Sequence, residues 1–215
     1  MELLKILKVN LRYNFLPHLI IAIIIALLTP VLFNINSLSE RAAAQPIELL
    51  LSFTGTILLT PIFLPEQNPN IRDVIRSKRF DYFKICMVRV AYSILAIILI
   101  NLIFVMNMKY HESAVNWQHF VGGCASAIFM GVIGFVVAGF SGNVVSGYMA
   151  SIIFYVANIG LKKELGVFYI FSMSMGGDFT IKYWLLFFSF VIILAVFALF
   201  YKCKIFRIKR SKFLH

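Results

Sequence analysis

The segment 65–84 has the residue pattern best suited to binding another molecule. Asn70 is placed to cap a helix, and Asp73 three residues later favours the positive N-terminal end of that helix. Such a helix places apolar side chains along one edge and arginines along another. We therefore predict a docking helix whose residues are Asn70, Ile71, Arg72, Asp73, Val74, Ile75, Arg76 and Lys78. Its apolar ridge would fit a partner protein, or the helix would lie on lipid headgroups with its arginines on phosphates.

Small residues recur at four-residue spacing in an apolar stretch further along the chain. Small side chains let helix backbones approach closely in lipid. The packing would join helices within one chain, or it would form a dimer or a sliding contact, and the pattern leaves these alternatives open. The residues are Gly123, Ala127, Gly131, Gly134, Ala138 and Gly142.

Two asparagines, Asn101 and Asn158, lie inside apolar stretches. Polar residues at such positions usually face the interior of a helix bundle. We expect them to form packing hydrogen bonds, and we name them as the candidates for lining a pathway. No buried ionisable relay of the kind used by proton-coupled carriers is expected, because no span carries a pair of acidic residues. Glu48 and Lys182 are counted on the outer side.

Motifs for catalysis are missing from the sequence. It contains no G-x-x-x-x-G-K-S/T phosphate loop, no H-E-x-x-H and no G-x-S-x-G. The four histidines are scattered, and the three cysteines form no C-x-x-C pair. We predict no catalytic residue, no metal and no cofactor bound by this chain.

Six stretches are apolar enough to cross a membrane. Hydrophobic residues make up 61% of the chain and charged residues 13%, whereas soluble domains are about half apolar and about a quarter charged. A spanning helix needs about 20 mostly apolar residues. The predicted fold is one all-α polytopic membrane domain with spans at 15–33, 46–64, 86–106, 120–140, 144–159 and 183–201. A further apolar run at 167–173 is too short to cross, so we expect it to be interfacial or re-entrant.

The basic residues indicate the orientation. Lys and Arg collect on the cytoplasmic side of membrane proteins. With the N-terminus inside, 15 of the 20 basic residues and four acids are cytoplasmic, so the whole net charge of +11 lies on that face. We therefore predict a plasma-membrane protein with both termini in the cytoplasm. Nucleic-acid binding is disfavoured, because it requires a folded, soluble basic face.

The N-terminal residues 1–14 mix leucines with lysines and an arginine. They are expected to form an amphipathic helix on the inner interface, with a solvated lead-in to the first span as the alternative. A cleaved signal peptide is a further alternative for the first span. It is disfavoured because the apolar stretch is longer than a usual signal core.

In layout the whole chain resembles the permease subunits of ABC-2 type transporters. The resemblance rests on six spans with both ends inside, the amphipathic lead-in, the basic helical loop introduced by Pro65-Glu66, and a partly apolar outer segment at 161–182. It implies that 70–78 is the coupling helix that docks on a separate ATPase subunit, with Glu66 as the acid that precedes it. It also implies that 166–177 is a short re-entrant helical hairpin near the exit of the pathway.

The same resemblance implies that the permease works in pairs, as a homodimer or with a related chain. ATP and Mg²⁺ would be held by the partner ATPase, and the transport cycle would be alternating access. The 22 phenylalanines favour an amphipathic or hydrophobic substrate, with a peptide or antimicrobial compound as the leading choice. Two alternatives are a membrane-embedded enzyme and an accessory or immunity protein that binds a partner without transport.

Overall fold

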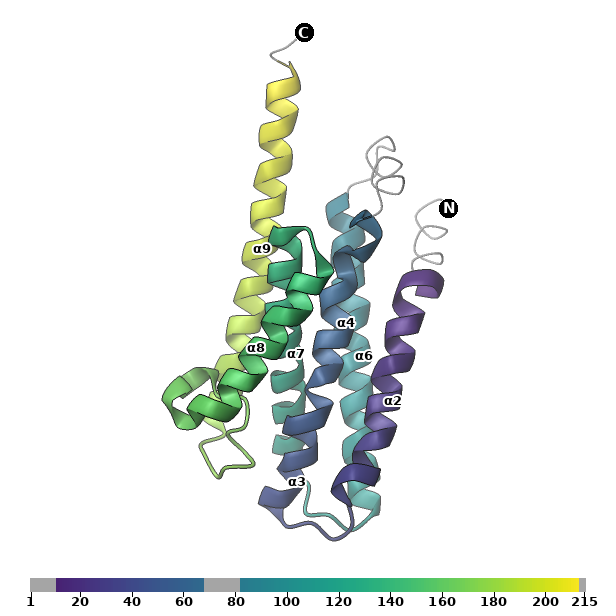
Figure 1. Ribbon diagram of the computed structural model, residues 1–215, viewed down its shortest axis with the longest axis vertical. Helices are drawn as coiled ribbons and strands as arrows, with labels where there is room; N and C mark the ends of the chain where they lie inside the picture. The colour runs from purple at the N-terminus through teal and green to yellow at the C-terminus, as the bar shows by residue number, and fades with distance from the viewer. Residues whose placement is uncertain (1–10, 68–81, 213–215) are drawn as a thin grey trace.

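The computed structural model describes residues 11–67 and 82–212, and every regular element in those ranges is a helix (Figure 1). Six helices are long and apolar enough to cross a membrane, which confirms the all-helical fold class and the predicted number of spans. They are Leu11–Phe33, Glu40–Pro65, Lys84–Tyr110, Trp117–Ser141, Val144–Leu161 and Thr180–Leu199. The chain is therefore built as a multi-pass membrane protein.

The first two spans are composite. The first joins a π-helical turn, η1 (Leu11–Phe15), to α2 (Leu16–Phe33). The second is assembled from α3 (Glu40–Pro46), π-helical η2 (Ile47–Leu51), α4 (Phe53–Leu59) and 3-10-helical η3 (Thr60–Gln67). Prolines at 46, 61 and 65 remove backbone donors along this span, which explains why its helical hydrogen bonding changes type.

The next three spans are continuous α-helices, namely α6 (Tyr82–Tyr110), α7 (Trp117–Ser141) and α8 (Val144–Leu161). The short fifth span is therefore regular. Gly142 ends α7 in the left-handed conformation, with φ of 67°, and its N–H bonds to the carbonyl of Ala138. Asn143 then caps α8 by accepting a hydrogen bond from the N–H of Val145.

Helix α7 occupies the centre of the bundle and packs against α4, α6, α8 and α9 (Thr180–Lys212). Helix α2 lies at the edge and exposes a broad face of leucine, isoleucine and valine, as expected for a surface in contact with lipid. In Figure 1, α2 begins and α9 ends at the same end of the bundle. We call this the terminal end, and we call the other the loop end.

The loop end is formed by the connections 34–39, 111–116 and 162–179 (Figure 1). The first two are bonded to each other, since the N–H of Ser37 donates to the carbonyl of His111 and that of Ala114 to Leu38. The third begins with the 3-10 helix η4 (Lys162–Phe168) and continues as turns until α9.

The expected helical hairpin at 166–177 is not formed. The structure has the end of η4 followed by turns, and Gly166 and Gly176 both adopt positive φ, at 54° and 67°. Residues in that conformation interrupt an α-helix. The segment nevertheless enters the bundle, because Tyr169, Ile170 and Phe171 are buried. The predicted coupling helix, Asn70 to Lys78, and most of the N-terminal amphipathic helix lie outside the described residues.

Candidate functional site: a buried ion pair and the segment it holds

A buried ion pair lies near the loop end of the bundle. The Nζ atom of Lys182, in the first turn of α9, is 2.6 Å from Oε1 of Glu48 in η2, and both side chains are fully buried. The expectation that the spans lack buried ionisable groups was therefore wrong. Both lie at predicted span ends, where composition does not reveal that a loop folds over them.

The carboxylate of Glu48 also binds backbone amides of the 162–179 connection. Its Oε1 accepts from the N–H of Met173 at 3.0 Å, and its Oε2 accepts from the N–H of Ser174 at 2.9 Å. A buried carboxylate is tolerated when its remaining lone pairs are satisfied by hydrogen bonds. The π-helical turn that presents Glu48 is itself a feature that is frequent at functional sites.

The ammonium of Lys182 is satisfied in the same way. It donates to Oγ of Ser126 at 2.7 Å and to the carbonyl oxygen of Ile170. The Ser126 hydroxyl in turn donates to that carbonyl at 3.2 Å. Gly122 on α7 makes room for the side chain of Met173, since a Cβ there would lie 2.3 Å from its Sδ.

Asn158, one of the two predicted pathway residues, also holds this connection. Its Oδ1 accepts a hydrogen bond of 2.9 Å from the N–H of Ile170, and its Nδ2 donates to the carbonyl of Phe154. We call residues 169–174 the inserted segment. We call the four side chains that bind its backbone the seat, which consists of Glu48, Ser126, Asn158 and Lys182.

Aromatic side chains flank the inserted segment. The ring of Phe171 packs edge-to-face on Tyr155 with centroids 5.3 Å apart, and Tyr155 lies 4.5 Å from the ring of Phe53. The hydroxyl of Tyr155 donates to the carbonyl of Leu49 at 2.9 Å. Burial, and then the nearby carboxylate of Glu48, raise the pKa of Tyr169 above its ordinary value.

A row of buried polar side chains extends from the seat along the second span. Four-residue spacing places them on one face of the helix, and they are Glu48, Ser52, Thr56 and Thr60. The three hydroxyl oxygens have no hydrogen-bond partner among the described residues. At the far end the row is tightly packed, since a Cβ on Gly134 would lie 2.1 Å from Oγ1 of Thr60, and one on Gly147 2.7 Å from its Cγ2.

The small residues predicted for helix packing face other helices of the same chain. A Cβ on Gly131 would lie 2.4 Å from the carbonyl oxygen of Gly55, and one on Gly55 would lie 1.7 Å from that of Ala127. Gly123 faces Ile47 and Asn101. Ala138 is buried in the core, while Gly142 ends α7. The stripe therefore joins α7 to the second span within one molecule.

Asn101, the other predicted pathway residue, is fully buried on α6. Its Nδ2 donates to the carbonyl of Ile97 at 2.9 Å, and its Oδ1 has no hydrogen-bond partner among the described residues. The structure does not bring Asn101 into the seat. Glu66 lies in η3 at the other end of the second span. The remaining docking residues are not described.

No known protein family, no curated protein and no solved structure matches this chain. Among the described residues, no group of histidine, cysteine, aspartate and glutamate is placed to hold a metal ion.

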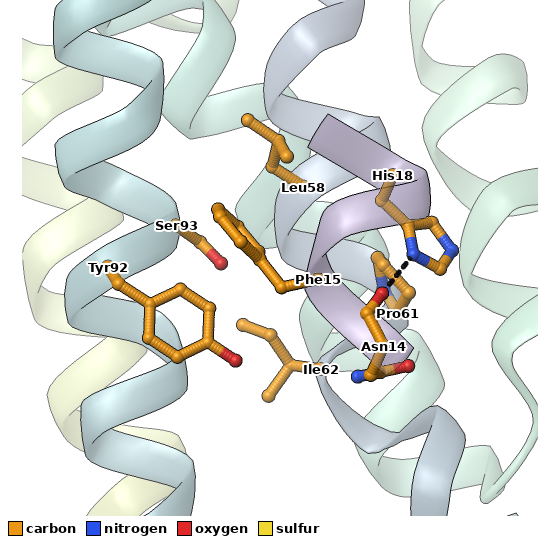
Figure 2. A pocket seen from close by; sticks show the side chains of 8 residues that line it. All are labelled: Asn14, Phe15, His18, Leu58, Pro61, Ile62, Tyr92 and Ser93. Atoms are coloured by element: carbon orange, nitrogen blue, oxygen red, sulfur yellow. Dashed lines mark hydrogen bonds between the residues drawn. The ribbon is translucent and has the colours of Figure 1, made fainter. Parts of the chain in front are cut away.

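A small hollow lies near the terminal end, where Phe15 of η1 enters between the second span and α6. Figure 2 shows the ring of Phe15 facing Tyr92, and the centroids of the two rings are 4.5 Å apart. His18 bonds to the carbonyl of Asn14 at 2.6 Å within its own helix. The lining residues are Asn14, Phe15, His18, Leu58, Pro61, Ile62, Tyr92 and Ser93. Because the hollow has a volume of only about 10 Å³, enough for one water molecule, we assign no ligand to it.

The seat residues Glu48, Ser126 and Lys182 were not predicted as a site. A signal for two of them is present in the sequence, because single charges of opposite sign lie at the same-side ends of two spans. Charged residues at such ends are usually exposed or directed to the interface, so the signal alone does not distinguish a buried pair. The Ser126 hydroxyl is one of many in apolar stretches and gives no signal of its own.

Proposed function

We propose that this chain is the membrane-spanning subunit of an ATP-driven exporter with the layout of the ABC-2 type permeases. Separate ATPase subunits hold ATP and Mg²⁺, and a second permease chain completes the assembly. Phosphate-loop residues are missing from the sequence, so the nucleotide must be bound elsewhere. The cargo is amphipathic or hydrophobic, and a peptide is the favoured class.

The observation that carries this proposal is the insertion of 169–174 at the end of the bundle opposite to the chain termini. An alternating-access transporter must close its outer end while the inner end is open. A loop held inside the bundle by four side chains from four helical elements is a structure able to provide that closure. A simple membrane anchor has no need for one.

The charge distribution supports the orientation. The terminal end lies where the sequence is most basic, and the positive-inside rule places such an end in the cytoplasm. In the plasma membrane the inserted segment then faces the exterior. Because Lys182 is buried and paired with Glu48, it adds no exposed charge to the outer face. The excess of exposed basic residues at the terminal end is therefore larger than the sequence alone indicates.

Helix η3 ends and helix α6 begins at the terminal end (Figure 1), and the residues between them lie outside the described part of the chain. We propose that residues 70–78 form the coupling helix. The apolar side chains of Ile71, Val74 and Ile75 would enter a groove of the ATPase, and the arginines would face its acidic rim. ATP binding would then move the second and third spans together.

The proposal is tested with the full chain in lipid nanodiscs and its ATP-binding cassette partner, which is isolated by affinity capture. The measured quantity is ATP hydrolysis with and without the membrane chain. We expect stimulation by the wild-type chain and its loss in the double variant I75D/R76E. The matched control is the double variant E112Q/H111Q, which changes exposed residues at the loop end.

Two results would contradict the proposal. One is recovery of the chain without any ATPase that it stimulates. The other is unchanged stimulation and assembly in I75D/R76E, which would show that residues 70–78 do not couple the chain to the ATPase.

A second candidate is an accessory or immunity protein that binds a partner without transport. The observation in its favour is the close packing around Thr60, where Gly134 and Gly147 bring α7 and α8 against the second span and leave no gap at this point. Transport of a labelled peptide by nanodiscs or vesicles that contain the complex would exclude this candidate.

A further inference from the structure

The contacts of the inserted segment have the form of a peptide bound to a receptor. Every hydrogen bond that the seat makes to the inserted segment reaches a main-chain atom of that segment. Glu48 accepts from the N–H groups of Met173 and Ser174. Asn158 accepts from the N–H of Ile170, while Lys182 and Ser126 donate to its carbonyl. Main-chain recognition does not depend on side-chain identity, so a different peptide is able to make the same bonds.

The side chains of the inserted segment impose few requirements on a peptide that would take its place. Phe171 packs on the ring of Tyr155, and Tyr169 and Ile170 are buried among aromatic and aliphatic groups. Ser172 contributes no hydrogen bond from its buried hydroxyl to any described residue. An aromatic or aliphatic residue two positions before a pair of free N–H groups is therefore sufficient to fill the site.

The seat cannot remain empty without a large cost. Without the segment, the Glu48 carboxylate loses two N–H donors and Lys182 loses an acceptor, within a bundle that is otherwise mostly apolar. Buried charges whose hydrogen bonds are removed are strongly unfavourable. A molecule that replaces the segment must therefore offer adjacent N–H donors and a carbonyl acceptor, which is the chemistry of a peptide backbone.

An approach to the segment is present on the loop side. A hollow of about 140 Å³ lies beside it, lined by Glu40, Arg41, Gln118, His119, Met173, Gly177 and Phe179. Met173 thus borders the hollow, while its N–H bonds to Glu48. A ligand that enters from the loop end meets the segment at Met173.

We propose that the seat is a peptide-binding site that the chain's own residues 169–174 occupy in the state described. The ligand is a short peptide with an aromatic or aliphatic residue, and it binds mainly through its backbone. The inference requires the geometry of the seat and does not require an ATPase. A negative result in the ATPase test would not contradict the peptide-binding site. A negative result in the peptide-binding test would not contradict the coupling to an ATPase.

The tethered segment competes with any added peptide. A covalently linked segment acts at an effective concentration in the millimolar range, so the wild-type chain should bind an external peptide only weakly. Weakening the segment's own bonds, with the seat left intact, should raise the affinity for the added peptide.

The direct test uses the full chain in nanodiscs and a fluorescent, end-capped peptide Tyr-Ile-Phe-Ser-Met-Ser, which copies 169–174. The variant M173P/S174P lacks the two N–H donors of the chain's own segment and keeps all four seat residues. We expect this variant to bind the peptide at least about tenfold more tightly than the wild type. Adding E48Q to the variant should remove that gain.

The matched control peptide carries N-methyl groups on its Met and Ser amides and therefore cannot donate to Glu48. It should bind no better to the variant than to the wild type. Gel filtration and thermal unfolding establish that the variant is folded. Equal binding of the two peptides, or binding that is unaffected by E48Q, would overturn the proposal.

A second measurement keeps the chain closer to its native state. In S174C, made in a C203S background, the N–H of residue 174 remains. Saturating capped peptide should displace the segment and increase the labelling rate of the new cysteine severalfold, and the N-methylated peptide should not. An unchanged labelling rate together with a folded M173P/S174P variant that binds no peptide would overturn the assignment.

Discussion

The guanidinium of Arg89 on α6 donates a hydrogen bond of 2.8 Å to the backbone carbonyl of Ile62 in η3. In a 3-10 helix that carbonyl would accept from the residue three positions later. Here that residue is Pro65, which has no N–H. Arg89 therefore donates to a carbonyl that the 3-10 pattern leaves without a donor. The side chain of Arg89 is buried at this position.

Replacing Arg89 by methionine should destabilise the chain by about 1.5–3 kcal/mol, because a charge-assisted hydrogen bond is lost from a buried carbonyl. The variant P65A restores an N–H at position 65. It should therefore stabilise the R89M chain more than it stabilises the wild type. Thermal unfolding of all four chains in detergent measures the difference, and an equal effect of P65A in both backgrounds would refute the pairing.

The close contact between the second span and α7 gives a second prediction. A Cβ at Gly55 would lie 1.7 Å from the backbone oxygen of Ala127, so α7 would have to move away. We expect G55A to destabilise the chain by about 3 kcal/mol or more, at the upper end of the range for overpacking.

Gly160 provides the matched control for G55A. It lies in α8 with no atom within 4 Å of an added Cβ. G160A should change stability by no more than about 1 kcal/mol, in the favourable direction that helix propensity gives. Equal losses of thermal stability in the two variants would show that the contact at Gly55 is not tight.

The six spans were predictable because lipid imposes a length and a composition that hydrophobic residues alone reveal. The boundaries were less accurate. Glu40 and Lys109 lie inside helices that continue beyond the predicted apolar stretches, since a helix does not end where lipid ends. The small residues were expected to allow close helix approach, and the pattern left open whether the partner helix belonged to the same chain; in the structure Gly131 faces Gly55 and Gly134 faces Thr60.

The seat was not predictable in the same way. Glu48 and Lys182 are far apart in sequence, and each alone fits an interfacial residue at the end of a span. Their pairing depends on how the connection 162–179 folds back, and that in turn depends on hydrogen bonds made by its backbone, which residue types do not encode. Asn158 was recognised as a polar residue that faces inward, although its partner, the N–H of Ile170, was not.

The orientation of the bundle gives a third prediction, which cysteine labelling can test. Gln67 is exposed at the terminal end and His111 at the loop end. Cys86 and Cys124 are buried, so a C203S background should give little labelling. A membrane-impermeant thiol reagent should label H111C in intact cells and Q67C only after permeabilisation. The reverse pattern would place the inserted segment in the cytoplasm and remove the exporter proposal.

The Glu48–Lys182 pair gives the last prediction. Replacing Lys182 by methionine leaves a buried carboxylate with two N–H donors but no counter-charge, and we expect a loss of about 3–5 kcal/mol. E48Q should also destabilise the chain, because a buried ammonium then faces an amide. In the double variant E48Q/K182M neither charge remains, so its loss should be clearly smaller than the sum of the two single losses.

The double-mutant cycle distinguishes a true pair from two independent buried residues. Unfolding of the four chains in one detergent gives the coupling free energy directly. A matched cycle on Glu40 and Lys109, which also lie at span ends near the loop end but form no ion pair in the structure, should be additive within about 0.5 kcal/mol. If the Glu48–Lys182 cycle were equally additive, the carboxylate and the ammonium would not be in contact in the membrane.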